Sequence, residues 1–293
     1  MKAIFFPGCL IPIKYPQFEV AVRRTLPRLD VEILDVAGFT CCPDPIFFQA
    51  SDKLGWLTLA ARNLAVAEQA GHDVFTICSG CTSTLREANQ ILRADEELRD
   101  RVNRRLARIG KVYRGTIEVR HIVPFLRDRV GLDLLRASVT RPLTGVRVAL
   151  HYGCHLLKPS AIMGVDDPDE PIILHQMISA IGAEPVKHDE RFLCCGKACT
   201  DPALPLEMTA TVLRSVKRAG VDCMGMICPT CFSSFDTGQL LIARKTGEQL
   251  EVPPVYYFQL LGLAQGLSPE EVGLTRQRIR PLALLEKIGA QPA

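Results

Sequence analysis

The stretch DVFTICSGCTSTL, residues 73–85, joins a short apolar run to a Cys-x-x-Cys motif and then to a helix-like segment. The stretch VDCMGMICPTCFSSF, residues 221–235, repeats that arrangement in the second half of the chain. A strand that leads directly into a helix is the building unit of a parallel α/β sheet. The chain therefore carries this unit twice, each time with two thiols at the point where the strand ends.

Each of these motifs belongs to a larger pattern of five cysteines. A lone cysteine, an adjacent pair and the Cys-x-x-Cys follow one another in the same order and at similar spacing in both halves. The first copy is Cys9, Cys41, Cys42, Cys78 and Cys81, and the second is Cys154, Cys194, Cys195, Cys228 and Cys231. A pattern that recurs in order indicates an internal repeat, and with it a duplicated site.

The periodicity of apolar residues gives both halves the same alternation of strands and helices. Strands are expected at 2–6, 31–36, 73–77, 146–151 and 221–227, and helices at 18–29, 52–69, 82–92, 171–181 and 202–219. We therefore expect an α/β protein with two pseudo-symmetric, Rossmann-like parallel-sheet domains. The stretch SVTRPLTG, residues 138–145, separates the copies and predicts domains at 1–143 and 144–293.

The repeated cysteines of each domain should lie close together. Most of them come just after a strand-like run, and ligands of parallel α/β sheets bind in the crevice beyond the carboxyl ends of the strands. Both Cys-x-x-Cys motifs should also open a helix, whose free N–H groups stabilise thiolates. The two cysteines outside the repeat are Cys199, which could approach the second site, and Cys223, which is expected to be a buried apolar thiol.

Five thiols brought together favour a polynuclear iron–sulfur core. Thiolates are soft ligands that suit zinc, copper(I) and iron–sulfur clusters, but a single zinc ion is satisfied by four ligands. Zinc in one or both repeats remains the alternative. Structural disulfides are disfavoured, because a chain of 293 residues with 47% hydrophobic residues can bury a core without them. Thioredoxin-like chemistry at the two Cys-x-x-Cys motifs leaves the other repeated cysteines unexplained.

The composition limits the kinds of binding partner and the cellular compartment that we expect. A net charge of +3 is too small to indicate a nucleic-acid binder. An arginine-rich stretch, residues 99–114, is read as a solvated helix face or as a docking surface for an acidic partner. The start, MKAIFFPGC, has no signal-peptide design, and no apolar run is long enough to span a bilayer. We therefore expect a cytoplasmic protein, where thiols stay reduced.

At its cysteines the chain resembles the family of the heterodisulfide reductase B subunit, whose members carry two cysteine-rich CCG domains. The similar stretches are FPGCLIPIKYP, FTCCPDP, ICSGCTSTLREAN, HYGCHLLKPS, FLCCG, CPTCFSSFDTGQ and FQLLGLAQGLSPEEVGL. They cover almost the whole chain. The segment GKACT, residues 196–200, departs from the glycine-rich continuation expected of the methanogen-type proteins and bears on the substrate rather than on the clusters.

The resemblance implies a function and a set of partners. Each repeat would hold one noncubane 4Fe-4S cluster through its five cysteines, and the two clusters would cleave a disulfide between them. In methanogens that substrate is the mixed disulfide of coenzymes M and B. Implied partners are the ferredoxin-like iron–sulfur C subunit and the flavin-containing A subunit of the same complex. The alternative is a non-catalytic electron-transfer protein, as in complexes of the succinate, glycerol-3-phosphate or lactate dehydrogenase type.

One residue outside the cysteines is a candidate for catalysis. His155 directly follows Cys154, and an imidazole near neutral pH can pass a proton to a departing thiolate. His151 and Lys158 lie in the same stretch, HYGCHLLKP, and are further candidates. The first repeat has no histidine beside Cys9, so we expect proton transfer to belong to the second repeat. The sequence leaves the substrate and the direction of the reaction open.

Overall fold

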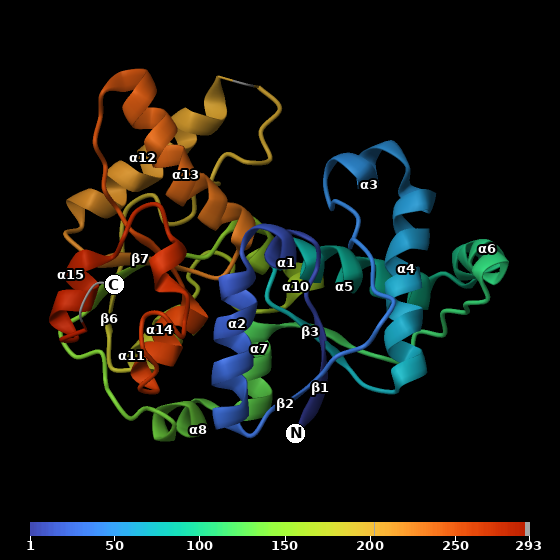
Figure 1. Cartoon of the computed structure of the whole chain (residues 1–293). Coiled ribbons are helices and arrows are strands. Elements are labelled where there is room, and N and C mark those ends of the chain that lie inside the picture. The colour runs from blue at the N-terminus through green and yellow to red at the C-terminus, as the bar shows by residue number, and fades with distance from the viewer. Residues whose placement is uncertain (202, 291–293) are drawn as a thin grey trace.

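The chain is described by a computed structural model that covers residues 1–201 and 203–290. It contains two separate four-stranded parallel sheets, which confirms the predicted α/β class with two similar halves (Figure 1). The first sheet has the order β2-β1-β3-β4, and the second has the order β6-β5-β7-β8. In sequence order the strands are β1 (Lys2–Phe6), β2 (Glu32–Leu34), β3 (Val74–Thr76), β4 (Val119–His121), β5 (Arg147–His151), β6 (Glu184–Val186), β7 (Cys223–Met226) and β8 (Pro254–Tyr256).

The helices alternate with these strands along the chain. They are α1 (Leu10–Lys14), α2 (Pro16–Thr25), α3 (Phe47–Ser51), α4 (Lys53–Ala70), α5 (Ser79–Ala94), α6 (Glu96–Leu106), α7 (Ile122–Phe125), α8 (Leu132–Ala137), α9 (Cys154–Leu157), α10 (Ser160–Met163), α11 (Ile173–Ala180), α12 (Leu204–Arg218), α13 (Pro229–Thr246), α14 (Tyr257–Ala264) and α15 (Leu282–Lys287). Three 3-10 turns cover Leu26–Leu29, Ala107–Ile109 and Leu274–Arg276, and a π-helical turn covers Leu126–Val130.

The strand order positions the site. In each sheet the chain leaves the first strand for one edge and then returns to pair on the other side, so the order reverses between β1 and β3 and again between β5 and β7. Doubly wound sheets bind their ligands beyond the carboxyl ends of the strands at this switch point. The segments that leave these four strands lead to Cys9, Cys78, Cys154 and Cys228.

Every strand and helix that the sequence predicted is present, with shifted ends. The helix expected at 18–29 divides into α2 and a 3-10 turn, because Pro27 cannot donate the next helical hydrogen bond. The helix expected at 202–219 begins at Leu204, and residue 202 lies outside the described residues. The three-residue strands β4, β6 and β8 were not predicted, whereas the equally short β2 and β3 were, because they lie within the longer apolar runs at 31–36 and 73–77.

The two halves pack against each other through aromatic side chains. Phe18 of α2 stacks on Tyr256 at the end of β8 with the ring centroids 4.1 Å apart, and it meets Phe232 of α13 edge-on at 4.8 Å. All three side chains are fully buried. In Figure 1, α2 lies between the first sheet and the helices α13 and α14 of the second half. A shared apolar core therefore fixes how the sheets face each other.

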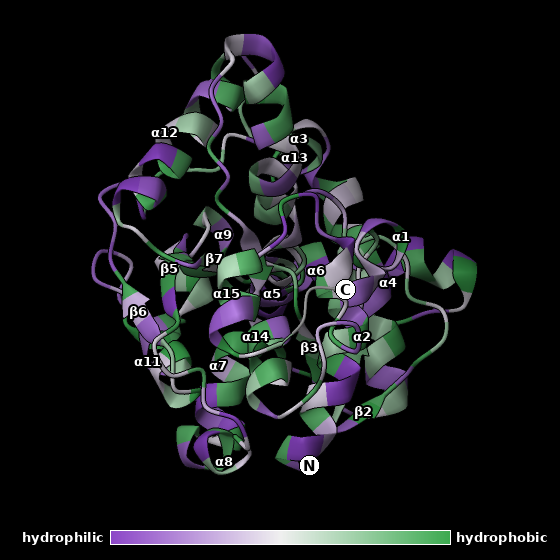
Figure 2. Ribbon diagram, turned by 60° about the vertical axis from the view of Figure 1, so that its left-hand side comes forward, coloured by the Kyte–Doolittle hydropathy of each residue, from purple (hydrophilic) through white to green (hydrophobic). Residues whose placement is uncertain are grey.

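The helix α12 is amphipathic. Along α12, purple and green residues alternate in Figure 2, as expected for a helix with one face on the core and the other in water.

Among the described residues, no helix is both long enough and apolar enough to cross a membrane.

Candidate functional site

The five thiols of the first repeat line one cavity of about 270 Å³. Within it, Cys42 Sγ lies 2.8 Å from Cys81 Sγ, and Cys41 Sγ lies 3.9 Å from Cys9 Sγ. The remaining lining is mostly apolar, from Pro7, Leu10, Ile11 and Pro45, with the carboxylate of Asp44 at one side. Loops from β1, β2 and β3 thus converge as the switch-point argument predicted.

The five thiols of the second repeat line a second cavity, of about 170 Å³. His155 and Lys197 also line this cavity, so it carries basic groups that the first one lacks. The sequence-predicted ligand sets are therefore each brought together around their own cavity.

The two cavities share a wall. Asp44, Pro45, Gly80 and Thr230 border both of them. Gly80 lies inside the first Cys-x-x-Cys and borders the second cavity, while Thr230 lies inside the second Cys-x-x-Cys and borders the first. A small molecule placed at this wall would be next to thiols of both repeats.

A glycine beside each lone cysteine leaves room for the thiols. Gly8 has φ +69°, and a Cβ there would lie 2.8 Å from Cys81 Sγ. Gly153 has φ +73°, and a Cβ there would lie 3.3 Å from Cys231 Sγ. Only glycine combines this backbone with such a close approach. The same requirement in both repeats indicates that one thiol site has been duplicated.

Hydrogen bonds among the thiols separate their pKa values. The bond with Cys41, more than any other contact, lowers the pKa of Cys42 to about 6, although burial opposes it. In the second repeat the bond with Cys154 likewise lowers the pKa of Cys194. Each site therefore contains a thiol that ionises near or below neutral pH, and the thiolate is the form that binds metals.

Each Cys-x-x-Cys opens a helix, as predicted. Cys78 is the N-cap residue of α5 and Cys228 is the N-cap residue of α13. Neither side chain caps its own helix, so both sulfurs remain available to the cavity. The helix N-termini place partial positive charge beside the thiols, which favours an anionic core.

These features fit an iron–sulfur core better than one metal ion. The five thiols that line each cavity exceed the four ligands that satisfy a single zinc ion. The thiols instead surround cavities wide enough for several atoms. Cysteine sulfurs around such a space match the donor set of iron–sulfur clusters.

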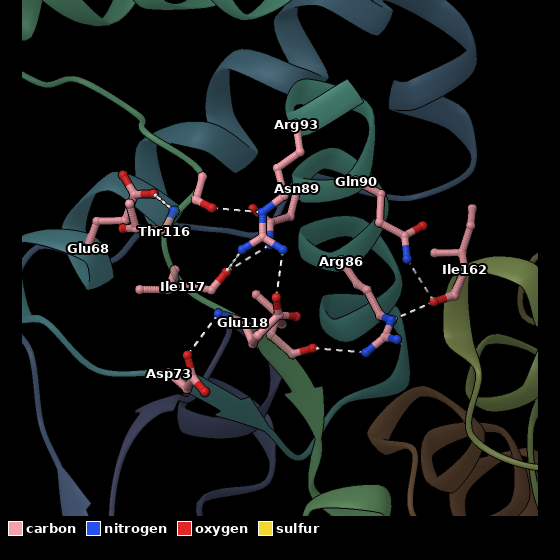
Figure 3. A network of polar contacts seen from close by, with 12 residues as sticks. Glu68, Asp73, Arg86, Asn89, Gln90, Arg93, Thr116, Ile117, Glu118 and Ile162 are labelled. Carbon is pink, nitrogen blue, oxygen red and sulfur yellow. Dashed lines mark hydrogen bonds and ion pairs between the residues drawn. The ribbon is translucent and has the colours of Figure 1, made fainter. Parts of the chain in front are cut away.

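A polar network fixes the helix that carries the first Cys-x-x-Cys. From α5, Arg86 and Gln90 both donate to the carbonyl of Ile162 in the second half, and Arg93 pairs with Glu118 (Figure 3). Arg93 also donates to the carbonyls of Gly115 and Ile117. One helix is therefore anchored both to its own sheet and to α10, which follows the Cys154 loop.

The other sequence candidates are placed differently. His155 lines the second cavity, and its Nδ1 is buried without a hydrogen-bond partner. His151 is buried in β5 edge-on to Phe235, where the first repeat has an apolar Phe6 at the same register. Lys158 lines a small neighbouring cavity with Cys154.

Two cysteines, Cys199 and Cys223, lie outside the five-cysteine repeats. Cys223 is fully buried in β7, as expected of an apolar thiol. Cys199 is half-buried and does not line the five-thiol cavity of the second repeat.

Some residues of the site were missed by sequence reasoning. Asp44 directly follows the first cysteine pair in CCPDP, and its Oδ1 accepts from the N–H groups of Ile46 and Phe47. Lys197 directly follows Gly196 after the second pair. Their closeness to the cysteines was the available signal. Nothing in the sequence indicated that Thr230 would border the site of the other half.

Comparison with known proteins agrees with this arrangement. The model of the CCG cysteine-rich domain matches twice, at residues 3–86 and 148–236. The fold is also similar to the crystal structure of a hypothetical protein from Helicobacter pylori, with a TM-score of 0.77, at 15% identity over 95% of this chain and 52% of that chain.

Curated relatives align along nearly the whole chain. The B subunit of a ferredoxin/F(420)H(2)-dependent CoB-CoM heterodisulfide reductase from Methanosarcina acetivorans is 40% identical over 98% of this chain and 97% of its own. A protein from Archaeoglobus profundus, named as similar to the heterodisulfide reductase B subunit, is 33% identical over 93% of each. A relative of another kind, the 8-methylmenaquinol:fumarate reductase membrane anchor subunit of Wolinella succinogenes, is 31% identical over 94% of this chain and 96% of its own. With two CCG domains and full-length relatives of this identity, the chain belongs to the family of the heterodisulfide reductase B subunit.

Proposed function

We propose that this chain is the disulfide-handling subunit of a heterodisulfide reductase-like complex, with one noncubane 4Fe-4S cluster held by the five cysteines of each repeat. The observation that carries the proposal is the shared wall of the two five-thiol cavities. A disulfide bound at that wall has one sulfur facing each site. The identity to relatives named as CoB-CoM heterodisulfide reductase subunits supports that disulfide as the first substrate to test.

The reaction takes up two electrons and two protons and yields two thiols from one disulfide. When bound, a pair of iron–sulfur clusters supplies electron transfer at the two ends of the disulfide. The chain's own residues position the substrate and exclude water: Leu10, Ile11 and Pro45 form apolar walls. Lys197 lies where it can offset negative charge that develops on a departing sulfur.

His155 is the proposed catalytic residue. Its imidazole lines the second cavity, and its buried Nδ1 has no protein partner that would hold it away from a substrate. Burial lowers the pKa of His155, so the side chain is neutral at pH 7 and offers one N–H as a donor. In this proposal that N–H donates a hydrogen bond to the departing sulfur and stabilises its negative charge, while the two protons of the reaction come from solvent.

The complex needs companion proteins in this proposal. The chain has no Gly-x-Gly-x-x-Gly fingerprint for a dinucleotide and no Cys-x-x-Cys-x-x-Cys run of a ferredoxin. Electrons would therefore arrive through an iron–sulfur C subunit that is linked to a flavin-containing A subunit. A cytoplasmic location completes the proposal, because ten thiols of this kind persist in a reducing compartment.

A second candidate is a non-catalytic electron-transfer subunit. It is favoured by the relative that is named as part of a fumarate reductase, which matches over nearly the whole chain. Both candidates place clusters in the two cavities, and they differ only in whether a disulfide is cleaved.

The experiment is disulfide turnover by the anaerobically purified chain with a reduced viologen as electron donor. We expect two thiols to be released for each CoB-CoM heterodisulfide consumed. The control donor is NADH, which should support no turnover by the isolated chain. Full cluster content with oxidisable clusters and no thiol release would reject the reductase and leave the electron-transfer candidate.

A further inference from the structure

Tyr256 and His121 occupy equivalent positions in the two sheets. Tyr256 is the last residue of β8 and pairs with Met226 of β7, while His121 is the last residue of β4 and pairs with Thr76 of β3. Both are buried, and both are the N-cap residue of the next short helix. Each side chain therefore starts from the same place relative to the Cys-x-x-Cys of its own half.

The two side chains reach different distances. His121 Nε2 lies 3.4 Å from the hydroxyl of Ser79, inside the Cys-x-x-Cys of its own half. The longer Tyr256 donates its hydroxyl to the carbonyl of Ile227, at 2.8 Å, and also to the carbonyl of Ile77 in the other half. Ile77 directly precedes Cys78, and Ile227 directly precedes Cys228. One phenol thus shares its single proton between the segments that deliver both Cys-x-x-Cys motifs.

Water cannot take the place of this hydroxyl. Tyr256 is fully buried, and its ring is held against Phe18 with 8° between the ring planes. If the hydroxyl were removed, the two buried carbonyl oxygens would lose that donor with no solvent to replace it.

We propose that Tyr256 is a positioning residue that ties both Cys-x-x-Cys segments to one hydroxyl and so fixes the separation of the two thiol sites. The inference rests on the proposed function in treating both cavities as cofactor sites that act on one substrate. Its consequence is that neither segment moves without the other, which keeps the shared wall at Gly80 and Thr230 at a constant width.

The test is Tyr256→Phe in the full-length, cluster-loaded chain, with Tyr257→Phe as the matched control. Tyr257 is the next residue and is also buried, but among the described residues its hydroxyl donates only to the carbonyl of Met177 in α11. The measurement is amide hydrogen exchange in peptides that cover 77–83 and 227–233.

We expect Tyr256→Phe to speed exchange in both peptides, on the order of five- to tenfold, since a lost buried hydrogen bond weakens local protection. Tyr257→Phe should change neither peptide. Faster exchange in only one peptide, or in none, overturns the inference, because a merely local role for Tyr256 predicts one of those results.

A second substitution covers the case in which Tyr256→Phe does not accumulate as folded protein. Placing 3-fluorotyrosine at position 256 keeps the ring and makes the hydroxyl a stronger donor, so both peptides should exchange more slowly. An unchanged rate in either peptide contradicts the inference. Exchange is measured without a disulfide, so its outcome is separate from the turnover test. Faster exchange in both peptides of Tyr256→Phe, together with a wild-type chain that cleaves no disulfide, would overturn only the proposed function.

Discussion

His155 is the residue that stabilises the departing sulfur in this account, through a hydrogen bond from its N–H. His155→Ala should keep its iron and lower the rate of disulfide cleavage by roughly 100-fold, because a departing thiolate loses its donor. His72→Ala is the matched control, since His72 precedes β3 and lies at the end of that strand opposite the thiols. Turnover and iron content are measured together. Iron loss in His155→Ala would assign the residue to cluster binding instead.

A side chain placed at a glycine of positive φ can strain the backbone and can also clash with neighbouring atoms. Comparison of Gly8 with Gly71 distinguishes these two effects. Gly8→Ala forces a Cβ to 2.8 Å from Cys81 Sγ, so we expect it to lose the iron of the first site. Gly71→Ala has a similar backbone, with φ +75°, but nothing lies within 4 Å of its Cβ. The control should keep all its iron and lose only about 1 to 2 kcal/mol of stability from the strained backbone. Equal iron content in the two variants would contradict the close approach.

At the residue scale, the sequence predicted which thiols lie together, but it did not predict contacts between the two halves. Order and spacing were enough to group Cys9 with Cys78, because both follow strands of one sheet. The contact of Thr230 with the first cavity depends on how the two sheets face each other. Spacing along the chain contains no information on that distance.

At the scale of the elements, α2 is the helix of the first half that packs against the second half through Phe18. Phe18→Ala removes a fully buried ring that touches both Tyr256 and Phe232, so we expect a loss of about 3 to 5 kcal/mol of stability. Val20→Ala, on the exposed side of the same helix, should stay within about 0.5 kcal/mol. Anaerobic denaturant unfolding measures both. A Phe18→Ala variant as stable as Val20→Ala would show that this contact does not hold the halves together.

The elements that the sequence predicted well are those that lie within a longer apolar or periodic run. The 18-residue helix α4 and the five-residue strand β1 appeared within one residue of their expected ends. The strand β6, Glu184–Val186, was missed because Pro185 disfavours a strand assignment. The last strand, β8, was missed too, and with it the position of Tyr256.

At the scale of the whole molecule, the repeat is a duplicated architecture with unequal sites. Both sheets have the same order, but the second cavity adds His155 and Lys197, whereas the first is bordered mainly by apolar residues. We propose a boundary between residues 143 and 144, because all strands of the first sheet precede it and all strands of the second follow it.

The most direct test of the central claim, that each repeat holds its own iron–sulfur core, is metal and sulfide analysis of anaerobically purified chain. The wild type should contain about eight irons and eight sulfides, while Cys42→Ala and Cys195→Ala should each contain about four, because each variant loses a ligand of one site only. The control Cys223→Ala, at a buried thiol away from the cavities, should contain about eight. Stoichiometric zinc in place of iron, or the loss of all iron in either single variant, would contradict two independent sites.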